Sequence, residues 1–171
     1  EHNPMLSYAA GYLDYLGTNK LSNEQIKQQF YKLACDYSIS ERNEVSYITL
    51  SGLNSNLPQA LALLNNLLSN AKVDKEAYDL YVEQILKSRS DNKANQKANF
   101  AALRNYATYG KYNPTRNIPS EQELKSINPQ VLLNLLKNLK NYKLTVLYYG
   151  PSSLKEVDQL VSKTIQTPKK F

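Results

Sequence analysis

Few side chains in this chain could take part in chemistry, and their small number limits the reactions available. The 171 residues include one histidine, His2, and one cysteine, Cys35. A single histidine excludes a two-histidine zinc site and leaves no internal pairing of a cysteine nucleophile with a histidine base. A single cysteine excludes an internal disulfide. We expect Cys35, placed in a helical segment, to be a small buried hydrophobic residue.

Carboxylates are the other groups that could act as acid and base. The sequence offers two pairs, Asp14 with Asp36 and Glu121 with Glu123. Their flanking sequences give no reason for a shifted pKa, so we interpret all four as solvated charges. Three serines have no histidine to activate them and are interpreted as polar strand positions: Ser38, Ser40 and Ser51.

The stretch SYAAGYLDYLGTNKLS begins with the spacing of a helix and contains three tyrosines. Tyr8 and Tyr12 are four residues apart, which places them on one helical face. Asn3 and Pro4 fit the start of this helix, and Gly17 fits its end. The spacing of these residues resembles that of a functional site on a helix, but the face carries no catalytic side chain. The chain has 14 tyrosines and no tryptophan; most lie on apolar stripes, which favours packing over the stacking of sugars or bases.

The charge of the chain is positive but dispersed. The net charge is +6, and lysines outnumber arginines. The sequence contains no arginine-rich cluster. Dispersed lysines are typical of a solvated surface, and glycine-rich phosphate loops are missing, so we predict no nucleic-acid partner. No apolar run reaches the roughly 20 residues of a membrane span, and no signal peptide is recognisable in this piece. If the parent protein is exported, its signal lies outside this piece.

Caps and apolar stripes predict a largely helical chain. Capping boxes begin at Ser22, Ser120 and Ser153, and prolines open two further helices near Pro58 and Pro129. We expect two more helices, from Asp74 to about Arg89 and from about Lys93 to Tyr109, with Gly110 after the second. The helix after Pro58 should be deeply buried through an almost continuous apolar stripe, which consists of Leu57, Leu61, Leu64 and Leu68.

Strands are predicted where apolar and polar residues alternate. Segments 37–40 and 44–53 alternate around a polar turn and predict a β-hairpin, and 144–150 predicts a third strand. Three strands are few for so many helices, so we expect the complete sheet to need more strands than this chain supplies. We therefore predict one α+β domain over 1–165, with helices packed in two layers on a small, mostly antiparallel sheet, and a linker or tail over 166–171.

The order of these elements resembles the insulinase, or pitrilysin, family of zinc metallopeptidases. In that family a helix with a His-x-x-Glu-His motif leads into Gly-Thr, which Gly17 and Thr18 match here. YITLSGLNSNLPQALALLNNLL over 47–68 is similar to the passage from strand to long helix in the family. LRNYATYG and LTVLYYGP are similar to segments of its longer members. The family's domain begins with strands before the motif helix, and these have no counterpart in the sequence as given.

The resemblance implies a decayed metal site. Counting back from Gly17, the two zinc-binding histidines of the family fall at Tyr8 and Tyr12, and the catalytic glutamate falls at Gly11. The family's third ligand is a glutamate with another glutamate seven residues earlier. Glu83 and Glu76 have that spacing, so Glu83 marks a possible remnant of the ligand position, while exposed helix charges are the simpler interpretation.

The resemblance also implies a function. Members of the family combine a zinc-carrying half with a non-catalytic half that closes a chamber around the substrate. We expect this chain to belong to the non-catalytic half and to be inactive alone. Its partners would be other domains of the same polypeptide, including an active zinc-binding half, and a peptide substrate. An unpaired sheet edge near Tyr47, Thr49 and Ser51 could hold that peptide.

A second interpretation comes from composition alone. The positive charge and the many tyrosines are also compatible with a stand-alone helical module that binds a protein or a polyanion, without peptidase ancestry. An independent module should be soluble and monomeric, whereas a severed peptidase domain should expose an apolar sheet edge. The two alternatives stay open on the sequence.

Overall fold

The computed structural model describes residues 5–42, 45–113 and 118–166. It shows an α+β fold, in which helices accompany a small antiparallel sheet. The chain divides into two compact units: the first runs to Asp74 and resumes at Pro129, and the second is Lys75–Asn128. The prediction of one domain over 1–165 stays a prediction. Asn3, Pro4 and nearly all of the predicted tail over 166–171 lie outside the described residues.

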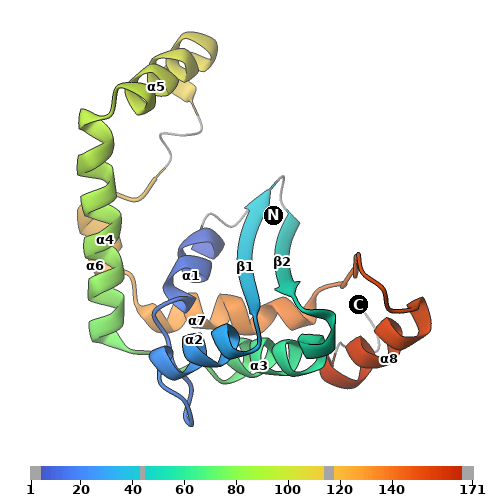
Figure 1. The fold of residues 1–171 in the computed structure, drawn as a ribbon. Coiled ribbons are helices and arrows are strands. Elements are labelled where there is room, and N and C mark those ends of the chain that lie inside the picture. The colour runs from blue at the N-terminus through green and yellow to red at the C-terminus, as the bar shows by residue number, and fades with distance from the viewer. Residues whose placement is uncertain (1–4, 43–44, 114–117, 167–171) are drawn as a thin grey trace. The chain divides into compact units, whose positions relative to one another are not determined.

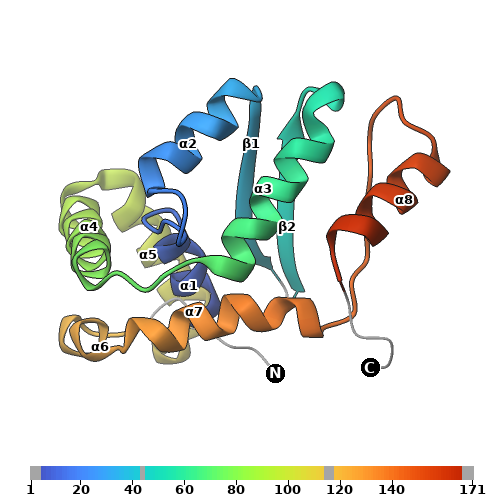
Figure 2. The same ribbon diagram turned by 90° about the horizontal axis from the view of Figure 1, so that it is seen from below.

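The first unit contains the sheet. Its strands β1 and β2 form a hairpin, and α3 contacts both of them. Helices α1 and α2 contact β1, whereas α8 lies toward the β2 side (Figures 1 and 2). The elements are α1 (Met5–Leu13), α2 (Asn23–Lys32), β1 (Cys35–Arg42), β2 (Val45–Gly52), η1 (Asn54–Asn56), α3 (Leu57–Asn70), α7 (Pro129–Asn138), η4 (Leu139–Asn141) and α8 (Leu154–Thr164).

The second unit is helical in its described part. It comprises α4 (Lys75–Ala94), α5 (Gln96–Tyr109), η2 (Gly110–Tyr112) and α6 (Glu121–Ser126). Tyr78 of α4 is buried, and its hydroxyl donates a hydrogen bond of 2.7 Å to the carbonyl of Leu124. The guanidinium of Arg89 donates a bond of 2.7 Å to the Pro119 carbonyl. These two bonds tie α4 to α6 and to the residues just before it.

All three predicted capping boxes are confirmed. The hydroxyl of Ser22 accepts from the backbone N–H of Gln25 at 3.2 Å, and the Gln25 side chain accepts from the Ser22 N–H at 2.8 Å. Ser120 and Ser153 make the same reciprocal pair of bonds at the starts of α6 and α8. Each box satisfies N–H groups that a helix start leaves without an internal partner.

The predicted hairpin is confirmed, and its register separates two faces. Paired residues lie directly opposite one another on antiparallel strands, so each pair shares a face. The inner face, toward α3, carries the pairs Tyr37 with Leu50 and Ile39 with Ile48. The outer face carries the pairs Ser38 with Thr49 and Ser40 with Tyr47, and all four of these residues are exposed.

The hydrophobic core of the first unit lies between the helices and the inner face of the hairpin. Cys35 is buried there as predicted and is a free thiol. The prediction that it lies in a helix is wrong, because α2 ends at Lys32 and Cys35 opens β1. The largest fully buried side chains of this unit are Tyr12, Leu13, Leu16, Ile26, Leu67, Leu132, Leu133 and Leu136.

Three predicted helix boundaries are wrong. Helix α1 ends at Leu13 and not at Gly17, because the N–H groups of Tyr15 and Leu16 bond three residues back in a tighter turn. Helix α4 continues past Arg89 to Ala94, since no glycine or proline interrupts it. Helix α5 begins at Gln96 because the Asn95 side chain caps it.

The predicted third strand over 144–150 does not form. Among the described residues the sheet has two strands, and this segment makes no ladder with either. Its strand-like alternation has no neighbouring strand to pair with, and a strand is stable only beside a partner. Its side chains are accordingly accessible: Leu147 is 88% exposed and Tyr149 fully so. The Tyr148 hydroxyl instead donates a bond of 2.6 Å to the Asn54 side chain.

The burial predicted for α3 is correct in part. Leu64 is buried, together with Ala60, Leu63 and Leu67. Leu57, Leu61 and Leu68 are only half-buried, although the sequence predicts them to be deep in the core. The three side chains lie on the part of α3 that faces the 142–148 segment and α8, where the packing is incomplete.

Gly52 is predicted to be indispensable to the hairpin. Its φ of +150° suits glycine, and an added Cβ would lie 2.5 Å from the carbonyl oxygen of Ala34. We expect Gly52→Ala to lower the free energy of unfolding, measured in urea, by roughly 3 kcal/mol. Gly110→Ala is the matched control, since Gly110 also has a positive φ but open space around it, and should lower it by about 1 kcal/mol. Equal losses would contradict the crowding at Gly52.

Candidate functional site

Helix α1, for which the sequence predicts a decayed metal site, holds a structural tyrosine. Tyr12 of α1 is completely buried. Its hydroxyl donates a hydrogen bond of 2.7 Å to the Asp74 carbonyl and accepts one of 3.0 Å from the Asp74 N–H. Gly11 and Tyr8, the other two positions of that predicted site, are half-buried on the same helix. The Tyr12 hydroxyl thus fastens α1 to the backbone that follows α3.

The Gly-Thr turn after α1 is equally tied to the backbone. An added Cβ at Gly17 would lie 2.6 Å from the carbonyl oxygen of Leu21, so only glycine fits without a shift. The Thr18 hydroxyl accepts from the N–H of Leu21 at 3.1 Å, and Lys72 donates its N–H to the Gly17 carbonyl at 3.0 Å. The turn therefore fixes α1 against the end of α3.

The remaining position from the resemblance, Glu83, lies on α4 in the other unit. Its side chain is exposed, as is that of Glu76. Its charge helps to raise the pKa of Lys125, after the larger effect of Glu121. Within the described residues, no group of three or more histidine, cysteine, aspartate or glutamate side chains is arranged to hold a metal, and His2 lies outside them. The role of Glu83 as a remnant stays a prediction.

One carboxylate makes a contact that the sequence did not predict. The Tyr37 hydroxyl donates a bond of 3.1 Å to Asp14, and the Tyr37 ring packs 4.9 Å from that of Phe30. Burial raises the pKa of Asp14, although the Tyr37 bond and the charge of Lys27 act in the opposite direction. Burial and the nearby Asp14 charge also raise the pKa of Tyr37. The pair links the residue that follows α1 to β1.

Glu121 and Glu123 are exposed, as the sequence predicts, but the prediction that their pKa values are unshifted is wrong. Glu121 forms an ion pair of 2.6 Å with Lys125, which lowers the pKa of Glu121. Hydrogen bonds from the capping residue Ser120 lower the pKa of Glu123. All of these groups are exposed on a helix surface, where ion pairs add little stability. They form no acid–base pair.

The outer edge of β2 has no partner strand among the described residues. Strand β2 pairs with β1 on one side, and no other described strand lies along its second side. In an antiparallel strand every second residue directs its N–H and C=O away from the partner. The predicted edge residues Tyr47, Thr49 and Ser51 lie on β2 and are exposed on its outer face. An edge of this kind can accept an extended chain.

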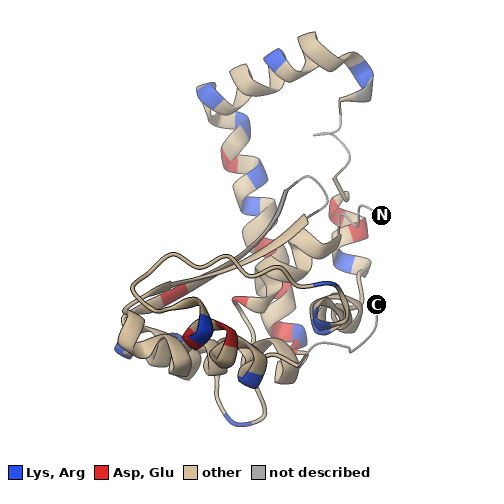
Figure 3. Ribbon diagram, turned by 90° about the vertical axis from the view of Figure 1, so that its right-hand side faces the viewer, with Lys and Arg blue, Asp and Glu red and all other residues tan. Residues whose placement is uncertain are grey.

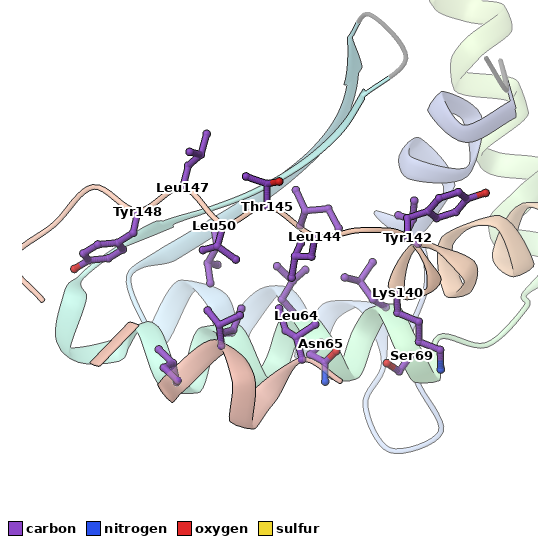
Figure 4. Close-up of a pocket in the computed structure, with 18 of the residues that line it drawn as sticks. Leu50, Leu64, Asn65, Ser69, Lys140, Tyr142, Leu144, Thr145, Leu147 and Tyr148 are labelled. Carbon is purple, nitrogen blue, oxygen red and sulfur yellow. The ribbon is translucent and has the colours of Figure 1, made fainter. Parts of the chain in front are cut away.

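An apolar pocket of about 260 Å³ lies beside that edge within the first unit. Its walls come from β2, from α3, from the ends of α7 and η4, from the 142–148 segment and from α8. Figure 4 shows Leu50 and Leu144 directed into it, while Leu147 stands outward. The leucines of α3 that are only half-buried line it: Leu57, Leu61 and Leu68.

The rim of the pocket is polar and positive. Asn65 and Ser69 of α3 lie near Lys140 at one end (Figure 4), and Lys137 also contributes to the lining. None of the described residues that line the pocket is acidic. The arrangement suits a chain segment that buries apolar side chains in the pocket and carries acidic or neutral groups at the rim.

The sequence did not predict the pocket, and the predicted role of the β2 edge in binding a peptide stays a prediction. The signal that could have found the pocket is the alternation of 144–150, a strand-like segment with no partner strand. The apolar residues of α8 give a second signal, since Leu160 and Val161 are half-buried and line the pocket. Both signals indicate apolar surface that the chain does not fully cover.

Comparisons with known proteins leave the family undecided. A scan against protein-family models gives no match, and a search of curated proteins finds none that matches the chain. Among the helices of the described part, none has the length and apolar character needed to cross a membrane.

The bonds of the Tyr12 hydroxyl give a direct prediction. Tyr12→Phe leaves both the N–H and the C=O of Asp74 without this partner in a partly buried place. We expect the free energy of unfolding to fall by about 2 kcal/mol, as measured by urea denaturation. Tyr31→Phe is the control, because Tyr31 is 87% exposed and its change should be negligible. A Tyr12 variant as stable as the control would contradict the structural role.

The raised pKa of Asp14 predicts how stability depends on pH. A carboxyl whose pKa is higher in the folded chain adds stability below its unfolded pKa and loses that contribution as the pH rises through the folded pKa. Asp14→Asn keeps an acceptor for Tyr37 and removes the charge, so it should be more stable than the parent at pH 7 and equal to it near pH 3 (roughly a unit below the ordinary carboxyl pKa).

Glu156→Gln is the control, because its effect on stability at pH 7 should be opposite to that of Asp14→Asn. Hydrogen bonds from Ser153 lower the pKa of Glu156, so its contribution is present at neutral pH and is lost on acidification. This variant should be less stable than the parent at pH 7. Thermal unfolding across the pH range measures both variants, and a destabilised Asp14→Asn at pH 7 would contradict the assignment.

Proposed function

We propose that this chain is a non-catalytic domain of a zinc-dependent metallopeptidase of the insulinase type. In this proposal it forms part of a peptide-binding chamber, and a zinc-binding half elsewhere in the polypeptide carries out the chemistry. The observation that carries the proposal is the open edge of β2 beside an apolar pocket of about 260 Å³. An extended peptide can pair with such an edge through its backbone and bury alternate side chains.

The residues of α1 support an inactive domain. Metal catalysis of this kind needs ligands that hold zinc and a carboxylate that takes a proton from the bound water. Tyr12 is buried and bonded to backbone at the position that the resemblance gives to a ligand, and Gly11 has no side chain. The contribution of this chain to proteolysis would then be steric: a wall and a binding edge.

The alternation of faces fits the proposed ligand. A peptide that extends the sheet beyond β2 places alternate side chains on the inner face, beside Ile48 and Leu50. These two residues line the pocket, so the peptide's apolar side chains would enter it. The intervening side chains would lie on the exposed outer face with Tyr47 and Thr49. Acidic groups would suit Lys137 and Lys140 at the rim.

The alternative is a stand-alone module that binds a protein, without peptidase ancestry. The exposed apolar face of α5 favours it, and that face is distinct from the β2 edge. The two proposals differ at the β2 edge, where only the first requires an extended peptide to bind.

Binding of a peptide to the full chain tests the proposal. We expect a labelled nine-residue peptide of alternating valine and glutamate to bind, measured by fluorescence anisotropy. Leu160→Asn should weaken the binding about tenfold, because Leu160 of α8 lines the pocket. The matched control is Leu154→Asn on the same helix, since Leu154 is 86% exposed and lies outside the pocket, and binding should change by less than about twofold.

Two further measurements complete the test. Purified chain should contain no stoichiometric zinc and should leave the peptide uncleaved, with or without a chelator. A scrambled peptide in which the valines and glutamates form two blocks should bind more weakly, because it cannot present alternate apolar side chains. Chelator-sensitive cleavage would overturn the assignment of an inactive domain, and equal weakening by both leucine variants would exclude the pocket.

A further inference from the structure

Helix α5 has its apolar side chains on the outside. Every residue of this helix is described, and none is buried. Phe100 is 66% exposed, Leu103 63% and Tyr106 54%. The residues of α5 that are half-buried are instead small or polar: Ala98, Ala101 and Asn105. A helix packed for its own unit would bury the phenylalanine and the leucine, so this face indicates a partner.

The spacing of the exposed residues fits a second helix. Phe100, Leu103 and Ala107 are separated by three and then four residues, which is the repeat of a seam between two helices. Polar residues interrupt this apolar face: Gln96 lies on the seam itself, four residues before Phe100, and Asn99 lies on its flank, four residues before Leu103. Membrane-surface helices keep polar residues on the face opposite their apolar side chains. The interrupted face therefore favours one helix as the occupant.

The charges beside the stripe define the partner further. Lys97 and Arg104 are seven residues apart, so both flank the same side of the seam, and both are exposed. Helix α5 contains no acidic residue (Figure 3), and Lys93 and Lys111 add positive charge just beyond its two ends. A second copy of α5 would offer these cations no carboxylate in either orientation, and an antiparallel copy would place like charges beside them. A partner with acidic flanking residues would pair with them.

We infer that α5 is a docking surface for an acidic amphipathic helix of another polypeptide. The partner's apolar stripe covers Phe100, Leu103 and Ala107, and its glutamate or aspartate side chains lie beside Lys97 and Arg104. This surface belongs to the second unit and is independent of the β2 edge.

The experiment uses the full chain and a synthetic helix as the probe. The probe is a four-heptad peptide with leucine and isoleucine in its seam and glutamate on both flanks. A matched peptide carries lysine on the flanks. Backbone NMR shifts of the full chain report where each peptide binds. We expect the glutamate peptide to shift the α5 amides in a saturable way and the lysine peptide to leave them unchanged.

Variants separate the apolar from the charged part of the surface. Phe100→Ser with Leu103→Ser should weaken binding of the glutamate peptide at least about tenfold. Lys97→Glu with Arg104→Glu should abolish that binding and create binding of the lysine peptide. Tyr31→Ser, at an exposed aromatic residue on α2, is the control and should leave both results unchanged. These positions are exposed, and circular dichroism verifies that each variant folds.

Three results would overturn the inference. Equal or absent binding of the two peptides would show that charge does not select the partner. Larger α5 shifts with vesicles containing phosphatidylserine than with the glutamate peptide would assign the face to anionic lipid. Self-association in sedimentation experiments that the Phe100 and Leu103 substitutions abolish would assign the face to a second copy of the chain.

Discussion

The contact between α3 and the inner face of the hairpin is the interaction on which the first unit depends. A two-stranded sheet is at best marginally stable alone, and its inner face must be covered. Helix α3 supplies that cover, while Tyr37 and Phe30 pack against each other at the β1 side. Cover is less complete on the β2 side, where Leu57, Leu61 and Leu68 are half-buried. The pocket and the open edge both follow from this imbalance.

The need to cover the inner face of the hairpin also explains the structural role of α1. The Tyr12 hydroxyl and the Gly17 turn fasten α1 to the backbone after α3, and α1 in turn contacts β1 and α7. Helix α1, for which the sequence predicts a decayed metal site, thus has a structural role. A buried tyrosine bonded to backbone positions the hairpin without supplying chemistry. The proposed function assigns the unit a binding edge and leaves catalysis elsewhere.

Much of the fold could be predicted from local sequence signals. The rest depends on contacts between segments far apart in the sequence, which local patterns do not show. Ser22, Ser120 and Ser153 fix helix starts within three residues of sequence, and the hairpin is set by a short alternating run. The 144–150 segment has the same alternation but no partner strand, which sequence pattern cannot reveal. The exposed positions Tyr47, Thr49 and Ser51 were placed correctly on β2. The pocket escaped prediction because segments far apart in the sequence build it.

Hydrogen exchange along β2 measures whether its outer edge is open. We expect alternate amides of Ser46–Gly52, those facing away from β1, to exchange rapidly in the free chain. They should become protected when the alternating valine and glutamate peptide is added, while the amides already paired with β1 change little. Protection of every β2 amide in the free chain, or no new protection with saturating peptide, would contradict an open edge that binds an extended chain.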